Sequence, residues 1–246
     1  LWDYGVSVLD FQEGNFEVLY IGDISVASYF GYGKIMRNIQ GIVFVSRNGT
    51  IYILCNITDG LTILSEVPPV GYQASQYRNG LCMGDMDDDH VEEVILAVGE
   101  ELYVLDLNDE IEYTIPICVN ITQQPVLSDI NADGNLDIIV VANNTLMLVD
   151  PVRKRILWKK HFTDSIASPP VTADVNGDKK LEIVLASGEN ICVVDEHGRI
   201  LLQFNIGRRV VSNIRVCDLN NDSRPDIIVP CKGRIKVYSV ELANSN

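Results

Sequence analysis

A period of about 45 residues recurs along the chain, and this repeat constrains the fold more than any other feature of the sequence. Short apolar runs of one type end at Asp10, Cys55, Asp106, Asp150, Asp195 and Ser239, with successive spacings of 45, 51, 44, 45 and 44 residues. A fixed period of this length is typical of repeat architectures. The structural unit to be explained is therefore the repeat rather than any single segment.

Each unit has the pattern of four short strands. In the best preserved copy, EIVLAS (residues 182–187), ICVVD (191–195) and ILLQF (200–204) are separated by tight-turn residues, and PPVTAD (169–174) precedes them. Such spacing favours consecutive antiparallel strands. Because helical periodicity is almost absent, we expect an all-β protein, a β-propeller of four-stranded antiparallel blades forming a single domain over residues 1–246. An open β-solenoid is the structural alternative.

The number of blades is less constrained than the type of fold. The chain begins on a third strand (residues 6–10, followed by 18–21) and ends on a third strand, so it encloses four complete units. This arrangement fits five blades with an overlapping strand, six blades with one short blade, or part of a larger ring.

Four loops between the first and second strands carry oxygen-bearing side chains at a common spacing. Positions 1, 3, 5 and 9 are always Asp, Glu or Asn, and position 7 is expected to offer its backbone carbonyl. In this order (1, 3, 5, 7, 9), the loops contain Asp85, Asp87, Asp89, Val91 and Glu93; Asp129, Asn131, Asp133, Asn135 and Asp137; Asp174, Asn176, Asp178, Lys180 and Glu182; and Asp218, Asn220, Asp222, Arg224 and Asp226.

These loops predict binding of up to four Ca²⁺ ions. Calcium takes six to eight oxygen ligands, whereas Mg²⁺ retains more of its waters, and no soft ligand is present to favour zinc or copper. Like charges crowded into short loops repel one another unless a cation lies between them. Four Ca²⁺ ions would reduce the formal net charge from −15 to −7.

The loops differ from one another at position 6, and one unit lacks the pattern. Only the second loop has glycine at position 6 (Gly134), where the others place His90, Lys179 and Ser223. We therefore expect the other turns either to differ or to bind the ion more weakly. In the earliest unit the alignment puts Gly33, Ile35, Arg37, Ile39 and Gly41 where the acids should be, so this unit is not expected to hold a cation in the same way.

At these loops the sequence resembles a known repeat family. DINADGNLDIIVVA and ADVNGDKKLEIVLAS resemble the calcium loops of FG-GAP/VCBS repeats, the module of integrin α-subunit-like β-propellers, over roughly residues 80–230. The strand that contains Leu157 and Trp158 is similar to the quinoprotein-like repeat. The resemblance implies a secreted or surface-exposed adhesion scaffold, in which Ca²⁺ stiffens the hairpins and other loops bind a protein or glycan.

The glycosylation sequons also favour the secretory pathway. They begin at Asn48, Asn56, Asn120, Asn143 and Asn221, and the last is discounted because it lies inside the fourth acidic loop. Asn48 and Asn143 share the turn between second and third strands, an exposed place for a glycan. The six cysteines are too sparse for a disulfide scaffold, so we expect buried thiols or one or two disulfides. Extracellular or cell-surface localisation is the resulting prediction.

A binding role is favoured over catalysis. The strong negative charge argues against nucleic acid as a partner, and no apolar run is long enough to span a bilayer, which fits a secreted chain or the ectodomain of an anchored protein. The three histidines lack a triad-like context. A quinoprotein-like dehydrogenase and a channel-site hydrolase or lyase are the enzymatic alternatives, and a purely architectural role is the remaining one.

Overall fold

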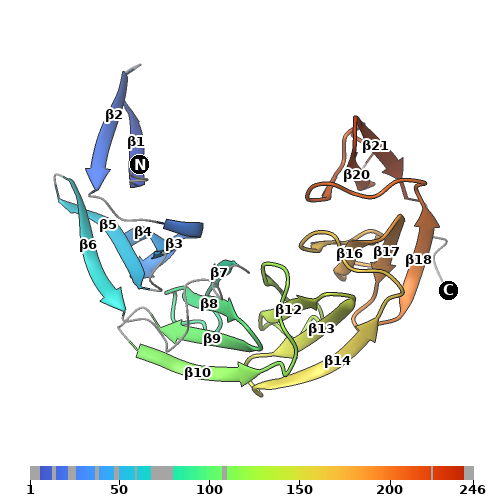
Figure 1. Cartoon of the computed structure of the whole chain (residues 1–246), viewed down its shortest axis with the longest axis horizontal. Helices are drawn as coiled ribbons and strands as arrows, with labels where there is room; N and C mark the ends of the chain where they lie inside the picture. The colour runs from blue at the N-terminus through green and yellow to red at the C-terminus, as the bar shows by residue number, and fades with distance from the viewer. Residues whose placement is uncertain are drawn as a thin grey trace. The chain divides into compact units, whose positions relative to one another are not determined.

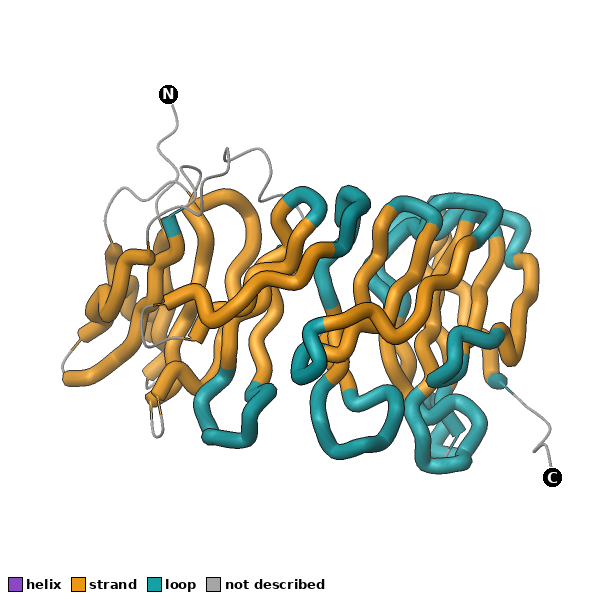
Figure 2. The backbone as a smooth tube through the Cα atoms, turned by 90° about the horizontal axis from the view of Figure 1, so that it is seen from below, coloured by secondary structure: helices purple, strands orange, loops and turns teal. Residues whose placement is uncertain are grey.

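A computed structural model provides the structure of the chain. It describes residues 6–12, 15–21, 26–36, 39–46, 50–58, 60–67, 80–106, 110–222 and 224–240. In these ranges Figure 2 shows strands and connecting loops, with no helix. The predicted all-β class is thereby confirmed for the described part of the chain.

The strands form a series of antiparallel sheets in chain order (Figure 1). A two-stranded hairpin, β1 (Val6–Gln12) and β2 (Asn15–Ile21), comes first. The next sheet contains β3 (Val26–Met36), β4 (Ile39–Ser46), β5 (Ile51–Thr58) and β6 (Gly60–Val67). It is followed by β7 (Leu81–Gly84), β8 (Glu93–Val98), β9 (Glu101–Asp106) and β10 (Glu110–Pro116).

Two further four-stranded sheets and one three-stranded sheet complete the series. The first contains β11 (Val126–Ser128), β12 (Asp137–Ala142), β13 (Thr145–Asp150) and β14 (Arg155–His161). The second contains β15 (Val171–Ala173), β16 (Glu182–Ser187), β17 (Asn190–Val194) and β18 (Ile200–Asn205). The last contains β19 (Arg215–Cys217), β20 (Asp226–Cys231) and β21 (Arg234–Ser239). In each sheet the strands pair in chain order, as the four-strand repeat predicts.

The chain divides into two compact units, residues Leu1–Cys118 and Val119–Asn246, which are described separately. In the first unit, the sheet β3–β6 packs against the sheet β7–β10. Its core includes Val43 and Val45 of β4, together with Val94 and Leu96 of β8, all of which are almost fully buried.

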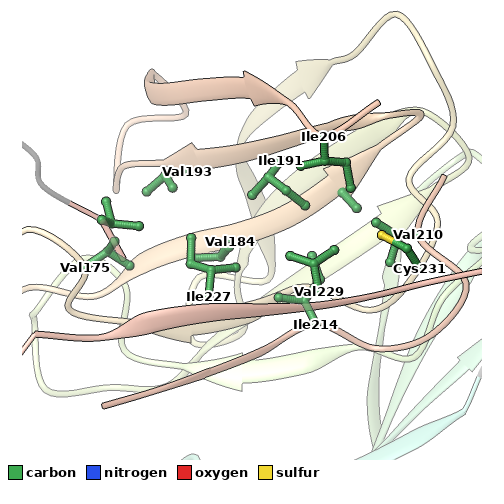
Figure 3. Close-up of a cluster of buried hydrophobic side chains, with 12 residues drawn as sticks. Val175, Val184, Ile191, Val193, Ile206, Val210, Ile214, Ile227, Val229 and Cys231 are labelled. Atoms are coloured by element: carbon green, nitrogen blue, oxygen red, sulfur yellow. The ribbon is translucent and has the colours of Figure 1, made fainter. Parts of the chain in front are cut away.

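In the second unit, the middle strands of β15–β18 are buried on both faces. Ile183 and Leu185 of β16 belong to the cluster shared with the sheet β11–β14, whereas Val184 and Ala186 belong to the cluster shared with β19–β21. Figure 3 shows this second cluster, including Val184 and Ile227. Because side chains alternate across a strand, an uninterrupted apolar run such as EIVLAS serves two interfaces at once.

A β-bulge interrupts the fourth strand of every complete four-stranded sheet. The pairing register shifts so that one residue of the fourth strand has no partner, and these residues are Leu64, Glu112, Leu157 and Leu201. A bulge at this place increases the local twist of the outermost strand. Since the bulges follow the repeat, they are part of the unit design and not isolated irregularities.

The ends of the strand series agree with the predicted phase. β1 aligns with the third strands of the other sheets and the three-stranded sheet ends on its third strand, β21, with four complete sheets between them. In the earliest complete sheet, β3 and β4 form a tight hairpin in which Met36 pairs with Ile39. The described residues at the aligned positions, Gly33, Ile35, Ile39 and Gly41, lie in these two strands and not in a loop. That this unit does not hold a cation in the same way stays a prediction.

The cysteines for which side chains are described carry free thiols. These are Cys82, Cys118, Cys192, Cys217 and Cys231, so of the two expectations the structure favours thiols over disulfides for these five. Cys55 lies in β5, but its side chain is outside the described part. Burial raises the pKa of the Cys82 thiol to about 12 and that of Cys192 to about 11, which keeps both thiols protonated and unreactive.

Candidate metal centre

The four acidic loops have one backbone design. Each connects the first strand of a sheet to the second, over residues 85–93, 129–137, 174–182 and 218–226. The residue at position 4 adopts a left-handed conformation in all four loops (Asp88, Ala132, Gly177 and Asn221), and so does position 6 in the three loops where it is described (His90, Gly134 and Lys179). Two left-handed residues two positions apart curl the loop so that alternate side chains point to one centre.

Of the two alternatives expected for loops without glycine at position 6, a different turn is not seen at His90 and Lys179, and weaker binding of the ion stays a prediction. His90 has a φ of 73° and Lys179 a φ of 71°, close to the conformation that Gly134 adopts at 90°. Non-glycine residues pay a steric penalty of about 1 kcal/mol in this region. Hydrogen bonds from their own backbone offset it, because the His90 and Lys179 N–H groups donate to the position 1 carboxylates Asp85 and Asp174 at 3.0 and 2.9 Å.

Backbone N–H groups inside each loop fix the ligand side chains. In the second loop the Gly134 N–H donates to Asp129 Oδ2 at 2.9 Å, the Asp133 N–H to Asn131 Oδ1 at 2.8 Å, and the Asn135 N–H to Asp133 Oδ1 at 2.9 Å. The bonds from position 5 to position 3 and from position 7 to position 5 recur in the other three loops. Each side chain is therefore held with lone pairs left over for a further positive partner.

The position 9 carboxylates lie at the base of the loops and are nearly fully buried. Glu93, Asp137, Glu182 and Asp226 are between 2% and 4% exposed. In every loop this carboxylate accepts the backbone N–H of position 2, as Glu182 accepts that of Val175 at 2.8 Å. Position 9 thus closes the loop. Its second oxygen accepts the position 3 amide in the second and third loops, whereas in the fourth loop Asp226 Oδ1 accepts the Ser239 hydroxyl.

Burial raises the pKa of three of these carboxylates. Desolvation raises the pKa of Glu93 and of Glu182 to about 7, and that of Asp137 to about 6, even though each accepts a backbone hydrogen bond that acts in the opposite direction. The neighbouring acids of the same loop raise the pKa further. Glu93, Asp137 and Glu182 therefore resist ionisation in a loop that contains no cation.

In the first loop, three carboxylates converge most closely. One oxygen each from Asp85, Asp87 and Asp89 lies within 4.8 Å of the others, and Asp85, Asp88 and His90 form a second group within the same distance. Asp85 Oδ1 is buried and accepts no hydrogen bond. A buried anionic oxygen without a donor is costly, and a hard cation is the partner that its chemistry fits.

In the second and third loops, an asparagine amide lies among the acids. The Asn176 Nδ2 group donates to Asp178 Oδ2 at 3.1 Å and to Glu182 Oε1 at 2.8 Å, and Asn131 Nδ2 donates to Asp137 Oδ1 at 3.2 Å. The positive end of the amide dipole partly offsets the crowded negative charge. In all four loops, backbone N–H groups of the same loop donate to positions 1, 3, 5 and 9. That these four positions bind one ion, and the carbonyl role of Val91, Asn135, Lys180 and Arg224 at position 7, stay predictions.

One contact at the third loop goes beyond the predicted ligand set. Lys180 Nζ donates to Glu196 Oε1 at 2.8 Å, which links position 7 to the turn between β17 and β18. This hydrogen bond lowers the pKa of Glu196 and raises that of Lys180. Since loops between strands 1 and 2 and between strands 3 and 4 lie at the same end of an antiparallel sheet, the topology contains a signal for this proximity.

Two of the predicted glycosylation sites are described, and both are exposed. Asn143 lies in the turn between β12 and β13, and Asn120 lies in the connection between β10 and β11. The Thr122 hydroxyl, from the Asn120 sequon, accepts the Asn143 N–H at 2.8 Å. Asn56 lies in β5 with its side chain undescribed, and Asn48 falls outside the described residues.

Comparison with known proteins shows the fold. No family model and no curated protein matches the chain. Among solved structures, BBS1N in complex with ARL6DN matches with a TM-score of 0.70 and 12% identity, covering 98% of this chain and 74% of that chain. The V. cholerae biofilm matrix protein Bap1 matches with a TM-score of 0.59 and 17% identity, covering 82% of this chain and 31% of that chain.

A third match comes from an unrelated source. BamB from Moraxella catarrhalis has a TM-score of 0.57 and 12% identity, and the match covers 91% of this chain and 64% of that chain. These structures are β-propeller-like, and identities this low establish the fold alone. The chain is thus an all-β protein of the β-propeller type, built of four-stranded antiparallel blades.

Proposed function

We propose that the chain is a calcium-stabilised extracellular β-propeller that serves as a non-catalytic scaffold for binding a protein or glycan. The observation that supports it best is the loop design repeated in four blades, with oxygen ligands at positions 1, 3, 5 and 9 held by backbone N–H groups. The unpartnered buried oxygen of Asp85 adds to this support. The FG-GAP/VCBS resemblance, which depends on the same loop residues, agrees with it.

The donor set determines which ion fits. All side chains at the four positions offer carboxylate or amide oxygens, and Ca²⁺ accepts up to eight such ligands at about 2.3–2.6 Å. A bound ion would replace mutual repulsion of the acids by coordination and would favour ionisation of the buried position 9 carboxylates. Sites of the 10⁻⁴–10⁻³ M class fill where calcium is millimolar, which supports the extracellular side.

Surface features and structural neighbours support a binding role. Phe30 and Tyr32 of β3 are 71% and 62% exposed, and exposed aromatic side chains are typical of recognition surfaces. One structural neighbour was crystallised in complex with ARL6DN, and another is a biofilm matrix protein. No helix within the described part of the chain is long and apolar enough to cross a membrane.

Calcium should raise the thermal stability of the chain, because the ion binds the folded loops and not the unfolded chain. We expect calorimetric titration to show up to four Ca²⁺ ions per chain, and chelation to lower Tm by several degrees. Asp133→Asn, which removes one carboxylate from the second loop, should lower the stoichiometry by one. Asp164→Asn, outside the loops, is the control. Absence of heat on titration together with an unchanged Tm in chelator would refute the metal proposal.

A further inference from the structure

We propose that Lys180 is a positioning residue for the third acidic loop and that its ion pair with Glu196 couples cation binding in this loop to Trp158 of the preceding blade. The proposal rests on the proposed calcium binding and adds to it a specific route. All residues concerned lie in the second unit.

The route begins at position 7 of the loop. The Lys180 backbone N–H donates to Asp178 Oδ1 at 2.8 Å, and its side chain reaches Glu196 Oε1 at 2.8 Å. The same residue is therefore fixed on one side by a proposed ligand and on the other by a neighbouring turn. At position 7 of the second loop, in contrast, the Asn135 side chain bonds back to Asp133 within its own loop.

The turn that contains Glu196 is tightly hydrogen-bonded. Asp195 Oδ1 accepts the His197 and Arg199 N–H groups at 3.0 and 2.8 Å, and Asp195 Oδ2 accepts Arg199 Nε at 2.6 Å. The Glu196 side chain is only 17% exposed. A turn held in this way moves as one body, so a displacement of the Glu196 side chain is transmitted to its backbone.

Trp158 of the preceding blade packs against the same turn. Trp158 Nε1, from the fourth strand β14 of the preceding blade, donates to the Glu196 carbonyl at 2.8 Å. Its ring lies against Gly198, where an added Cβ would be 3.0 Å from Trp158 Cε3. The indole therefore contacts the turn through both its N–H and its ring face. The fluorescence emission of Trp158 should consequently change when the turn is displaced.

The proposed coordination predicts how cation binding would move Lys180. When a cation draws the position 5 carboxylate and the position 7 carbonyl toward one centre, the Lys180 backbone moves with them and its side chain carries the change to Glu196. Side-chain contacts that orient a ligating residue without themselves touching the metal typically change metal affinity by about tenfold or more, and the contact of the Lys180 side chain with Glu196 is of this kind. The ion pair on its own is half-exposed and contributes little to stability. Its effect should therefore appear in metal binding and not in folding.

The test uses the full chain with Trp2→Phe, which leaves Trp158 as its sole tryptophan. We expect Ca²⁺ titration to change its emission, and Asp178→Asn, but not the equivalent Asp133→Asn in the second loop, to remove this response. Lys180→Met should remove it and weaken binding at one site about tenfold, whereas Lys180→Arg should restore both. Lys179→Met is the matched control, because it removes the same charge from the adjacent exposed position.

The outcomes separate the two proposals. If calorimetry detects no Ca²⁺ binding, the proposed function and the coupling both fail. If all variants bind calcium alike and the Trp158 emission does not respond, the coupling is refuted while calcium binding stands. If Lys179→Met weakens binding as much as Lys180→Met, the effect is one of charge and Lys180 is not a positioning residue.

Discussion

At the scale of single residues, the buried carboxylate at position 9 is the most informative group in the chain. It lies at the base of every acidic loop and accepts the position 2 backbone N–H. Burial alone would make the residue a poor choice for a purely structural role, because desolvation opposes its charge. An acid nevertheless recurs at position 9 in all four loops. A cation that compensates the cost of desolvation would explain this recurrence.

The raised pKa values predict an unusual pH dependence for the chain in chelator. Glu93 and Glu182 have folded-state pKa values of about 7 against 4.5, and Asp137 about 6 against 3.8. The folded state then binds more protons than the unfolded state between about pH 4 and 7, so the free energy of unfolding falls as pH rises through this window. Urea unfolding in EDTA at pH 4.5, 6 and 7.5 measures this fall in the free energy of unfolding.

The variant Glu182→Gln tests whether the buried carboxylates cause this pH dependence of the free energy of unfolding. Glu182→Gln keeps the size of the side chain and one acceptor oxygen, replaces the other acceptor by an NH2 donor, and removes the titration. The loss of stability between pH 4.5 and 7.5 should therefore become smaller. If the chain in EDTA gains stability across this range, the raised pKa values are wrong.

At the scale of elements, the hairpin of β3 and β4 shows what replaces an acidic loop. Gly33 and Gly41 pair with each other across the two strands. A Cβ on Gly41 would lie 2.5 Å from the backbone oxygen of Leu54, whereas the atoms nearest to one on Gly33 belong to the carboxylate end of Glu92. The two glycines thus differ in what limits them, although they are direct partners in the hairpin.

This difference gives a prediction for alanine substitution. Gly41→Ala should destabilise the chain by about 1–3 kcal/mol, because the β5 backbone has to move away from the new methyl group. Gly33→Ala should cost less, since a flexible side chain can swing aside. Chemical denaturation of the two variants compares them directly. Equal losses would show that the close approach of Leu54 does not limit residue 41.

Strand order, loop phase and the lack of acids at the aligned positions of the earliest unit could be derived from the sequence. Apolar runs such as EIVLAS have strand length, and the acids recur at a period that no local propensity explains. The left-handed turns at His90 and Lys179 could not be derived, because glycine preference is a poor guide where loop hydrogen bonds offset the strain. The contact from Lys180 to Glu196 needs the hairpin geometry, and that from Trp158 to Glu196 needs the packing of two blades.

At the scale of the whole molecule, the net charge has the largest expected effect on stability. With a formal charge of −15, the folded chain repels itself, and crowded acids in the loops account for much of the effect. Salt screens such repulsion over about 8–10 Å at physiological ionic strength. Bound calcium would act on the same charges directly.

The increases in Tm caused by NaCl and by Ca²⁺ should not be additive. In chelator, raising NaCl from about 0.02 to 0.5 M should increase Tm, whereas in millimolar Ca²⁺ the increase should be much smaller because the net charge is about halved. Thermal unfolding at both salt concentrations, with and without Ca²⁺, gives the four values needed. An identical salt increment under both conditions would contradict a major role for the loop charges.

The antiparallel order of the strands assigns opposite ends of each blade to different tasks. In the second unit, the acidic loops and the turns after third strands share one end, while Asn143 lies in a turn at the other. A bulky sugar attached at Asn143 would consequently leave the end with the acidic loops accessible to solvent. Such a sugar would shield one end of the blade from proteases, and immobilisation of the chain through it would present the acidic loops to the medium.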